Sequence, residues 1–118
     1  MTPFEKAFVA HLVADWLLQN DWMARNKSSL AHPAAWVHAS IHGVFLGLIL
    51  GWVAGVTLGV LHMLVDTRVP QRWWGRVYRQ TGDGPLRDHV QIWGDQVIHI
   101  ATIALWFLVE PLLRKWIG

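Results

Sequence analysis

The chain has 118 residues, of which 53% are apolar and only 15% are charged, and its formal net charge is +2. Soluble domains carry about 25% charged residues, and a domain this small has little interior in which to hide apolar side chains. The composition therefore excludes a disordered chain, argues against a soluble enzyme or a nucleic-acid binder, and favours a small membrane protein. The absence of cysteine excludes disulfides and thiolate-ligated metal sites.

The first predicted helix covers residues 3–24. Thr2 can cap it, Pro3 suits its first position, and Glu5 completes a capping box. Its charges leave no uninterrupted apolar stretch of about 18 residues, so by itself it is a marginal membrane span. A polar, basic turn follows at residues 25–29.

Residues 34–67 form the most apolar part of the chain. A single helix over this range would be about 51 Å long, whereas the hydrocarbon core of a bilayer is about 30 Å thick. We therefore predict two short helices, at about 34–50 and 53–67, with a turn near Gly51 to Gly55. Glycine recurs at every fourth position from Gly43 to Gly59, which would let helix backbones approach closely.

The remaining sequence predicts an interfacial segment and a last helix. Residues 68–87 contain five arginines with tryptophans between them, so we expect an amphipathic piece at about 70–80 in the headgroup layer. A turn is expected at 81–85, followed by a helix at about 88–110 that Pro111 should kink or end. The prediction is one all-α domain over residues 1–118, an integral membrane four-helix bundle whose interfacial segment lies between helices three and four.

The distribution of basic residues predicts an orientation. The connections after the first and third helices carry seven Lys and Arg residues, and the opposite side carries three. Because cytoplasmic connections are enriched in these residues, we expect a multi-pass protein with both termini outside and both basic connections in the cytoplasm.

Four segments each carry two potential metal ligands at positions i and i+4. These pairs are His11 and Asp15, His38 and His42, His62 and Asp66, and Asp95 and His99. On a helix this spacing puts both side chains on one face, and in a bundle such pairs can build a site for two ions. Hydrogen bonding between helices would explain one such pair, but four matched pairs favour metal. Imidazole and carboxylate ligands suit zinc, iron, manganese or nickel, so we expect one or two divalent ions without choosing among these metals.

Four further polar residues are candidates for supporting roles. Gln19 lies one turn beyond Asp15, and Gln96 adjoins Asp95 but points about 100° away from it on an ideal helix, so both could orient ligands. Lys27 and Arg68 lie at the predicted cytoplasmic mouth. They could hold an anionic substrate, although snorkelling to the interface is the more common use of such side chains.

The chain resembles a known family at these motifs. The segments HLVADWLLQNDWMARNK (11–27), HASIH (38–42), LHMLVDT (61–67) and GDQVIH (94–99) are similar to domain-of-unknown-function family 3307. That resemblance implies a small bacterial or phage integral membrane protein, located in the bacterial inner membrane. It places the family motif on His11, Asp15, Gln19, Lys27, His42, His62, Asp66, Asp95, Gln96 and His99. A weaker similarity, to membrane-bound metal-dependent hydrolases, implies hydrolysis by analogy only.

Three functions fit these observations. The first is a metal-dependent hydrolase of a phosphoester or lipid headgroup at the cytoplasmic interface, with Asp15 or Asp95 as general base. The second is a non-catalytic membrane protein whose metal site staples the helices for partner binding. A metal or proton transporter ranks last, because the outer halves of the helices are almost free of polar residues. The sequence leaves open whether the protein is an enzyme. The expected partners are the lipid bilayer and a second copy in a homodimer, with no nucleic acid.

Overall fold

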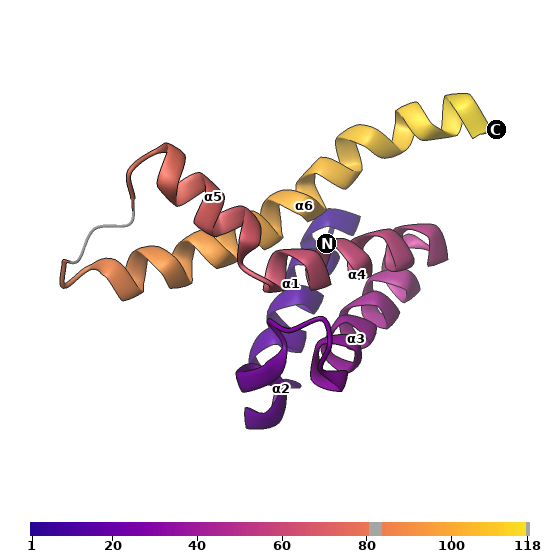
Figure 1. Ribbon diagram of the computed structural model, residues 1–118. Helices are drawn as coiled ribbons and strands as arrows, with labels where there is room; N and C mark the ends of the chain where they lie inside the picture. Colours follow the sequence, from indigo (N-terminus) through magenta and orange to yellow (C-terminus); the bar gives the residue numbers. More distant parts are fainter. Residues whose placement is uncertain (81–83, 118) are drawn as a thin grey trace.

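The computed structural model describes residues 1–80 and 84–117, so residues 81–83 of the expected turn lie outside the described residues. The described chain is all-α and compact, with overall dimensions of 49 × 31 × 30 Å. Figure 1 shows its six helices: α1 (Pro3–Trp16), α2 (Asp21–Asn26), α3 (Pro33–Leu50), α4 (Trp52–Asp66), α5 (Val69–Val77) and α6 (Arg87–Ile117).

The first helix is shorter than the sequence predicts. The capping box of Thr2 and Glu5 starts α1, but the helix ends at Trp16 rather than near residue 24. The short helix α2 then begins at Asp21, where the Asn20 side chain accepts a hydrogen bond from the Met23 backbone N–H. Asparagine is among the strongest N-caps because its side-chain oxygen satisfies a free backbone donor. This cap starts a new helix within the range 3–24, over which the sequence predicts one continuous helix.

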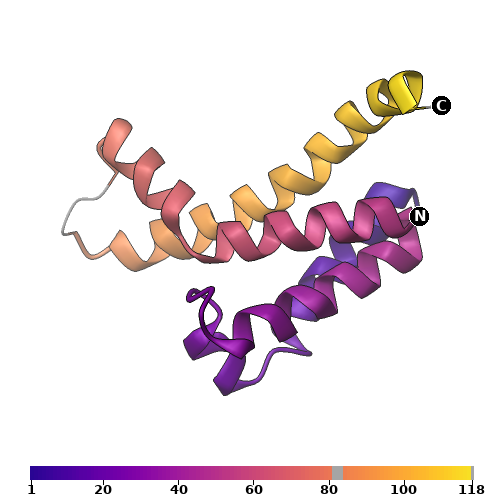
Figure 2. The same cartoon turned by 45° about the vertical axis from the view of Figure 1, so that its right-hand side comes forward.

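A tight hairpin of α3 and α4 is the centre of the fold. The chain reverses at Gly51, whose φ of +98° is accessible mainly to glycine. The two helices pack so closely that a Cβ atom on Gly55 would lie 2.6 Å from the Gly43 carbonyl oxygen. Figure 2 shows the two helices running side by side from this turn. The close packing carries the ligand pairs of both helices toward each other.

The helices α5 and α6 form a second arm. Arg68 adopts a left-handed backbone conformation (φ +63°), and α5 leaves α4 there at an angle of 59°. From its start at Arg87, α6 runs back along α5 and then along the bundle (Figure 1). It does not end at Pro111, which lies inside the helix. Proline removes only one backbone N–H, and the hydrogen bonds on either side of it can keep the helix together.

The interior of the bundle has an apolar layer and a polar layer, and a smaller apolar cluster of Ala35, Ala39 and Met63 lies between α3 and α4. An apolar layer lies toward the α3–α4 turn and consists of Ala7, Leu46, Leu58 and Ile103, with Phe4, Leu50, Trp106 and Phe107 packed against it. The second layer lies at the other end of the same helices and contains histidine and aspartate side chains. These polar side chains form the candidate site.

Two helices, α3 and α6, are long and apolar enough to cross a membrane, and a third span results if the bent pair α4 and α5 is counted as one. The 14 residues of α1 extend only about 21 Å, less than the bilayer's hydrocarbon core of about 30 Å. Large apolar side chains are exposed on α6, including Leu108 at 71% and Trp116 at 89%.

Candidate metal centre

The buried polar and charged residues of the described chain are seven members of the four predicted pairs. They are His11, Asp15, His38, His42, His62, Asp66 and His99, each no more than 5% exposed. They come from α1, α3, α4 and α6, so each of these four helices contributes to one cluster. Burying so many ionisable groups is costly unless they are paired or bind an ion. The arrangement of their atoms therefore decides what the cluster can do.

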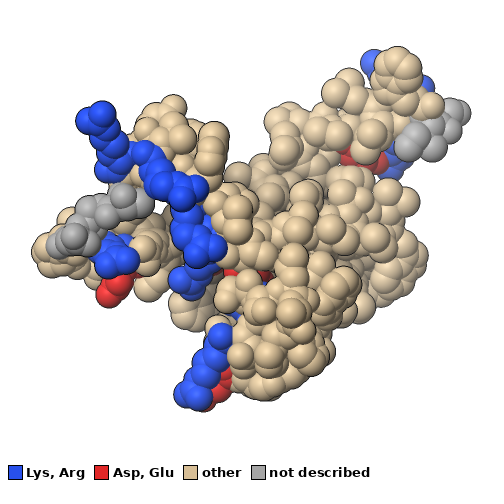
Figure 3. All heavy atoms as spheres, in the orientation of Figure 1, with Lys and Arg blue, Asp and Glu red and all other residues tan. Residues whose placement is uncertain are grey.

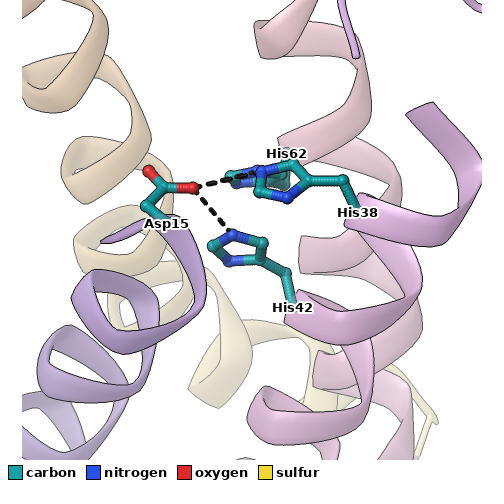
Figure 4. A group of neighbouring side chains, drawn as sticks. All are labelled: Asp15, His38, His42 and His62. Atoms are coloured by element: carbon teal, nitrogen blue, oxygen red, sulfur yellow. Dashed lines mark hydrogen bonds and ion pairs between the residues drawn. The ribbon is translucent and has the colours of Figure 1, made fainter. Parts of the chain in front are cut away.

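The first group of potential ligands contains Asp15, His38, His42 and His62 (Figure 4). The Asp15 Oδ1 atom lies 2.9 Å from Nε2 of His42 and 3.1 Å from Nε2 of His38. Figure 4 shows the carboxylate of α1 facing the three imidazole rings, which come from α3 and α4. One carboxylate and three imidazoles form a donor set typical of zinc and other first-row divalent metals.

The second group contains His62, Asp66 and His99. The Asp66 Oδ2 atom lies 3.0 Å from Nε2 of His62, and its Oδ1 atom lies 3.1 Å from Nε2 of His99. His62 belongs to both groups, since its Nε2 atom also lies 3.8 Å from Asp15 Oδ1. The two groups therefore adjoin, and their ligand atoms could hold one or two ions.

Hydrogen bonds explain only part of the close contacts in this cluster: the 2.9 Å contact between His42 Nε2 and Asp15 Oδ1 is a hydrogen bond, but several other contacts are not. Nε2 of His38, His62 and His99 and Oδ1 of Asp66 are buried, and within the described chain none has a hydrogen-bond partner. Yet these atoms lie 3.0–3.5 Å from an oxygen or nitrogen of the neighbouring ligands. Atoms bound at about 2.0–2.2 Å to one tetrahedral ion are separated by roughly 3.3–3.6 Å. Side chains that converge at this spacing without hydrogen-bond geometry resemble the edges of a coordination shell.

His11 lies outside both groups and supports them. Its Nε2 atom lies 3.3 Å from Asp15 Oδ2 and 3.2 Å from the Gln96 Oε1 atom. The Gln96 amide also donates a 3.3 Å hydrogen bond to Asp15 Oδ2. His11 and Gln96 thus hold the carboxylate whose other oxygen faces His38 and His42. Such outer contacts fix the orientation of ligands and raise metal affinity.

Asp95, the eighth member of the pairs, also lies outside both groups. Its side chain is 15% exposed, and its Oδ2 atom lies 3.6 Å from Nδ1 of His99. His99 Nδ1 donates instead to the Asp95 backbone carbonyl at 2.7 Å, which leaves Nε2 facing Asp66. A residue that no sequence pattern predicts, Gln71, donates to Asp95 Oδ1 at 2.7 Å and to the Val65 carbonyl at 2.9 Å. The only feature of the sequence that singles out Gln71 is that it is an uncharged polar residue near the arginines of α5.

The other three candidates take different positions. Lys27 lies at the cluster, with its Nζ atom 3.7 Å from Asp66 Oδ1. Arg68 lines a pocket between α5 and α6 and has no contact with the seven buried side chains among the interactions of the described chain. Gln19 is partly buried, and its Oε1 atom has no hydrogen-bond partner within residues 1–80 and 84–117.

Comparison with known protein families identifies a match. The family model described as "Protein of unknown function (DUF3307)" matches residues 4–116. No curated protein and no solved structure matches the chain. All seven buried residues of the cluster, together with Asp95 and Gln96, fall inside the matched range. Because that match covers nearly the entire sequence, the chain belongs to the DUF3307 family.

Proposed function

We propose that this protein is a membrane-embedded, divalent-metal-dependent hydrolase of phosphoesters. The observation that carries the proposal is the buried cluster of five histidines and two aspartates, in which several ligand atoms converge without hydrogen-bond geometry. The ligand set consists of imidazole and carboxylate groups and suits zinc, iron, manganese or nickel. A divalent ion there would supply a Lewis acid that activates water and polarises a phosphoryl oxygen.

Asp15 and Asp95 have different roles in this proposal. Asp15 acts as a ligand, because its Oδ1 atom faces the imidazoles of His38 and His42. Asp95 acts as the general base, since it lies outside both ligand groups and its side chain reaches the surface. The water oxygen bonds to phosphorus and the P–O bond to the alcohol breaks. Asp95 takes one proton from the water and returns it to the leaving oxygen, so that an alcohol and a phosphate result.

The arrangement of the helices supports a multi-pass position in the bacterial inner membrane. In Figure 2 both chain ends and the α3–α4 turn lie at one end of the bundle, and α2 and α5 lie at the other. The basic residues after α1 and α4 are therefore on one side, which we assign to the cytoplasm. The exposed apolar side chains of α6 face lipid or a second copy of the chain in a homodimer.

One observation favours a second function. The seven buried side chains are at most 5% exposed, and structural metal sites are typically closed in this way. In that case the ion would staple α1, α3, α4 and α6 together and contribute folding free energy without catalysis. The two functions differ in what removal of the metal does: a catalyst loses turnover, whereas a stapled bundle unfolds.

The first test is the metal content of the detergent-purified protein, measured by mass spectrometry. We expect one or two ions per chain in the wild type and loss of metal in His62→Ala and Asp66→Asn, because each change removes a converging ligand. The matched control is His89→Ala, since His89 is exposed on α6 and lies outside the cluster. Hydrolysis of p-nitrophenyl phosphate should fall with the metal content and recover when metal is restored.

The same preparation separates the alternatives. Circular dichroism and gel filtration show whether each variant folds, and Asp66→Asn keeps the shape of the side chain. A folded wild type without metal would refute the proposal. Bound metal without turnover, together with unfolding by a chelator, would support the structural function instead.

A further inference from the structure

A pocket of about 230 Å³ lies between α5 and α6, beside the cluster. Its polar lining includes Arg68, Arg72, Gln71 and Asp95, and its apolar lining includes Trp74 and Ile98. Arg68, whose backbone is left-handed just before α5 begins, and residues from α5 and from the first half of α6 therefore meet around one cavity. The pocket combines basic, amide and apolar side chains, as ligand sites commonly do.

The two arginines determine the charge of this pocket. Arg72 donates from its Nη2 atom to the Thr67 carbonyl at 3.2 Å, which anchors the side chain and leaves other guanidinium donors for a ligand. Figure 3 shows the basic side chains as a band over α5, and residues 67–80 contain no acidic residue. Asp95 is the acidic member of the lining, but Gln71 and His99 contact its two oxygens. The lining therefore favours an anion, and arginine matches the oxygens of a phosphate group.

The pocket adjoins the buried cluster through Asp95. Its wall includes Asp95, whose Oδ2 atom lies 3.6 Å from Nδ1 of His99, and the Nε2 atom of that imidazole lies 3.1 Å from Asp66. The cluster residues themselves are at most 5% exposed, so a ligand cannot reach them directly from the surface. A phosphate group held by the arginines would lie on the side of Asp95 that is open to solvent.

We propose that the α5–α6 pocket binds the phosphate group of the substrate and presents it to Asp95. This inference rests on the proposed function for the reaction that follows, but the binding itself does not depend on metal. The shared chemistry is a phosphate ester, either soluble or at the head of a lipid. The apolar side chains of Trp74 and Ile98 add a surface for the first methylenes of a lipid phosphate.

The test measures binding of inorganic phosphate, glycerol phosphate and dihexanoyl phosphatidic acid to the full detergent-purified chain by calorimetry. We expect Arg68→Gln and Arg72→Gln each to weaken phosphate binding about tenfold, because each removes a charge-assisted hydrogen bond. Arg76→Gln is the matched control, since Arg76 lies on α5 outside the pocket lining. Metal content should stay unchanged in all three variants.

A steric variant tests the pocket without changing its charge. A Cβ atom on Gly94 would meet no heavy atom within 4 Å, and Gly94 lines the pocket. Gly94→Leu should therefore fold, fill the pocket and weaken phosphate binding by about the same factor as an arginine change. This variant keeps the inference testable if an arginine variant fails to fold.

The outcomes separate the two proposals. If none of the three ligands binds the wild type, or if binding is indifferent to both arginines and to Gly94→Leu, the pocket inference is wrong even when metal is present. If phosphate binds through the arginines and no metal is found, the pocket stands and the hydrolase proposal fails. Tighter binding of the lipid than of glycerol phosphate would identify the lipid source, and equal binding would identify a soluble phosphoester.

Discussion

At the residue scale, the adjacent residues Asp95 and Gln96 of α6 contact different neighbouring helices. Gln96 reaches toward α1, where its amide contacts His11 and Asp15. Asp95 faces α5, where Gln71 donates to it. Successive residues of a helix point about 100° apart, so adjacent residues on a helix packed between two partners can face different partners. The pair therefore links the ligand cluster on one side with the α5–α6 pocket on the other.

Removing the Gln96 amide should weaken metal binding without removing a ligand. Gln96→Leu leaves the Asp15 carboxylate without one donor, so we expect metal affinity to fall roughly 10–100-fold. The measurement is competition with a chelator of known affinity. Gln91→Leu is the control, because Gln91 lies on the same helix and lines the pocket rather than the cluster. Equal losses in both variants would contradict a specific role for Gln96.

The site residues that can be predicted from the sequence are those that recur with the i and i+4 spacing of a helix. The i and i+4 spacing identifies seven side chains that are buried together, and it also includes Asp95, which the structure places outside both ligand groups. Gln71 has no such signal, because its contact with Asp95 depends on the bend of 59° between α4 and α5. That bend follows from the left-handed conformation of Arg68, which no pattern in the sequence predicts.

At the element scale, the α3–α4 hairpin sets the distance between ligands. Gly43, Gly55 and Gly59 bring the two backbones together, and the rings of His42 and His62 stack with their centroids 3.5 Å apart. The glycine spacing predicts close packing, and the structure shows which glycines meet. The turn itself forms at Gly51, which has positive φ and needs no proline or polar cluster.

A methyl group at Gly55 should force the hairpin apart. Its Cβ would lie 2.6 Å from the Gly43 carbonyl oxygen and from the Gly47 Cα, so Gly55→Ala should lower the free energy of unfolding by about 1–3 kcal/mol. Gly94→Ala is the control, because its Cβ has open space and alanine favours helix by about 1 kcal/mol over glycine. Thermal unfolding in detergent measures both. A Gly55→Ala protein as stable as the wild type would show that the helices are not in close contact.

The break between α1 and α2 is a feature that the sequence does not predict. The apolar character of residues 3–24 predicts one helix, but Leu17, Leu18 and Gln19 form no helix and Asn20 caps a new one. An asparagine followed by an aspartate is a helix-start signal that is easily read as the polar face of a longer helix. The separate α2 brings its C-cap residue Lys27 to within 3.7 Å of Asp66.

At the scale of the whole molecule, the apolar layer and the His/Asp cluster lie at opposite ends of the bundle. The apolar layer is near the α3–α4 turn and contains no ionisable side chain, whereas the cluster is near α2 and α5. The 18 residues of α3 extend about 27 Å and α1 extends about 21 Å, so these two helices are shorter than the bilayer core of about 30 Å, whereas α6 with 31 residues is longer. In the membrane position proposed above, the lipid around these two helices would thin, or flanking side chains would reach out of it, to match this length.

The proposed orientation places the cluster and pocket at the cytoplasmic face, and the absence of cysteine makes this testable. Ser28 lies exposed after α2, and Lys115 lies exposed near the end of α6. In intact cells a membrane-impermeant maleimide should label Lys115→Cys but label Ser28→Cys only after permeabilisation, because the basic connection lies inside. The cysteine-free wild type is the control for background. The opposite labelling pattern would put the α5–α6 pocket outside the cell, and any phosphoester that it binds would then come from the periplasmic side.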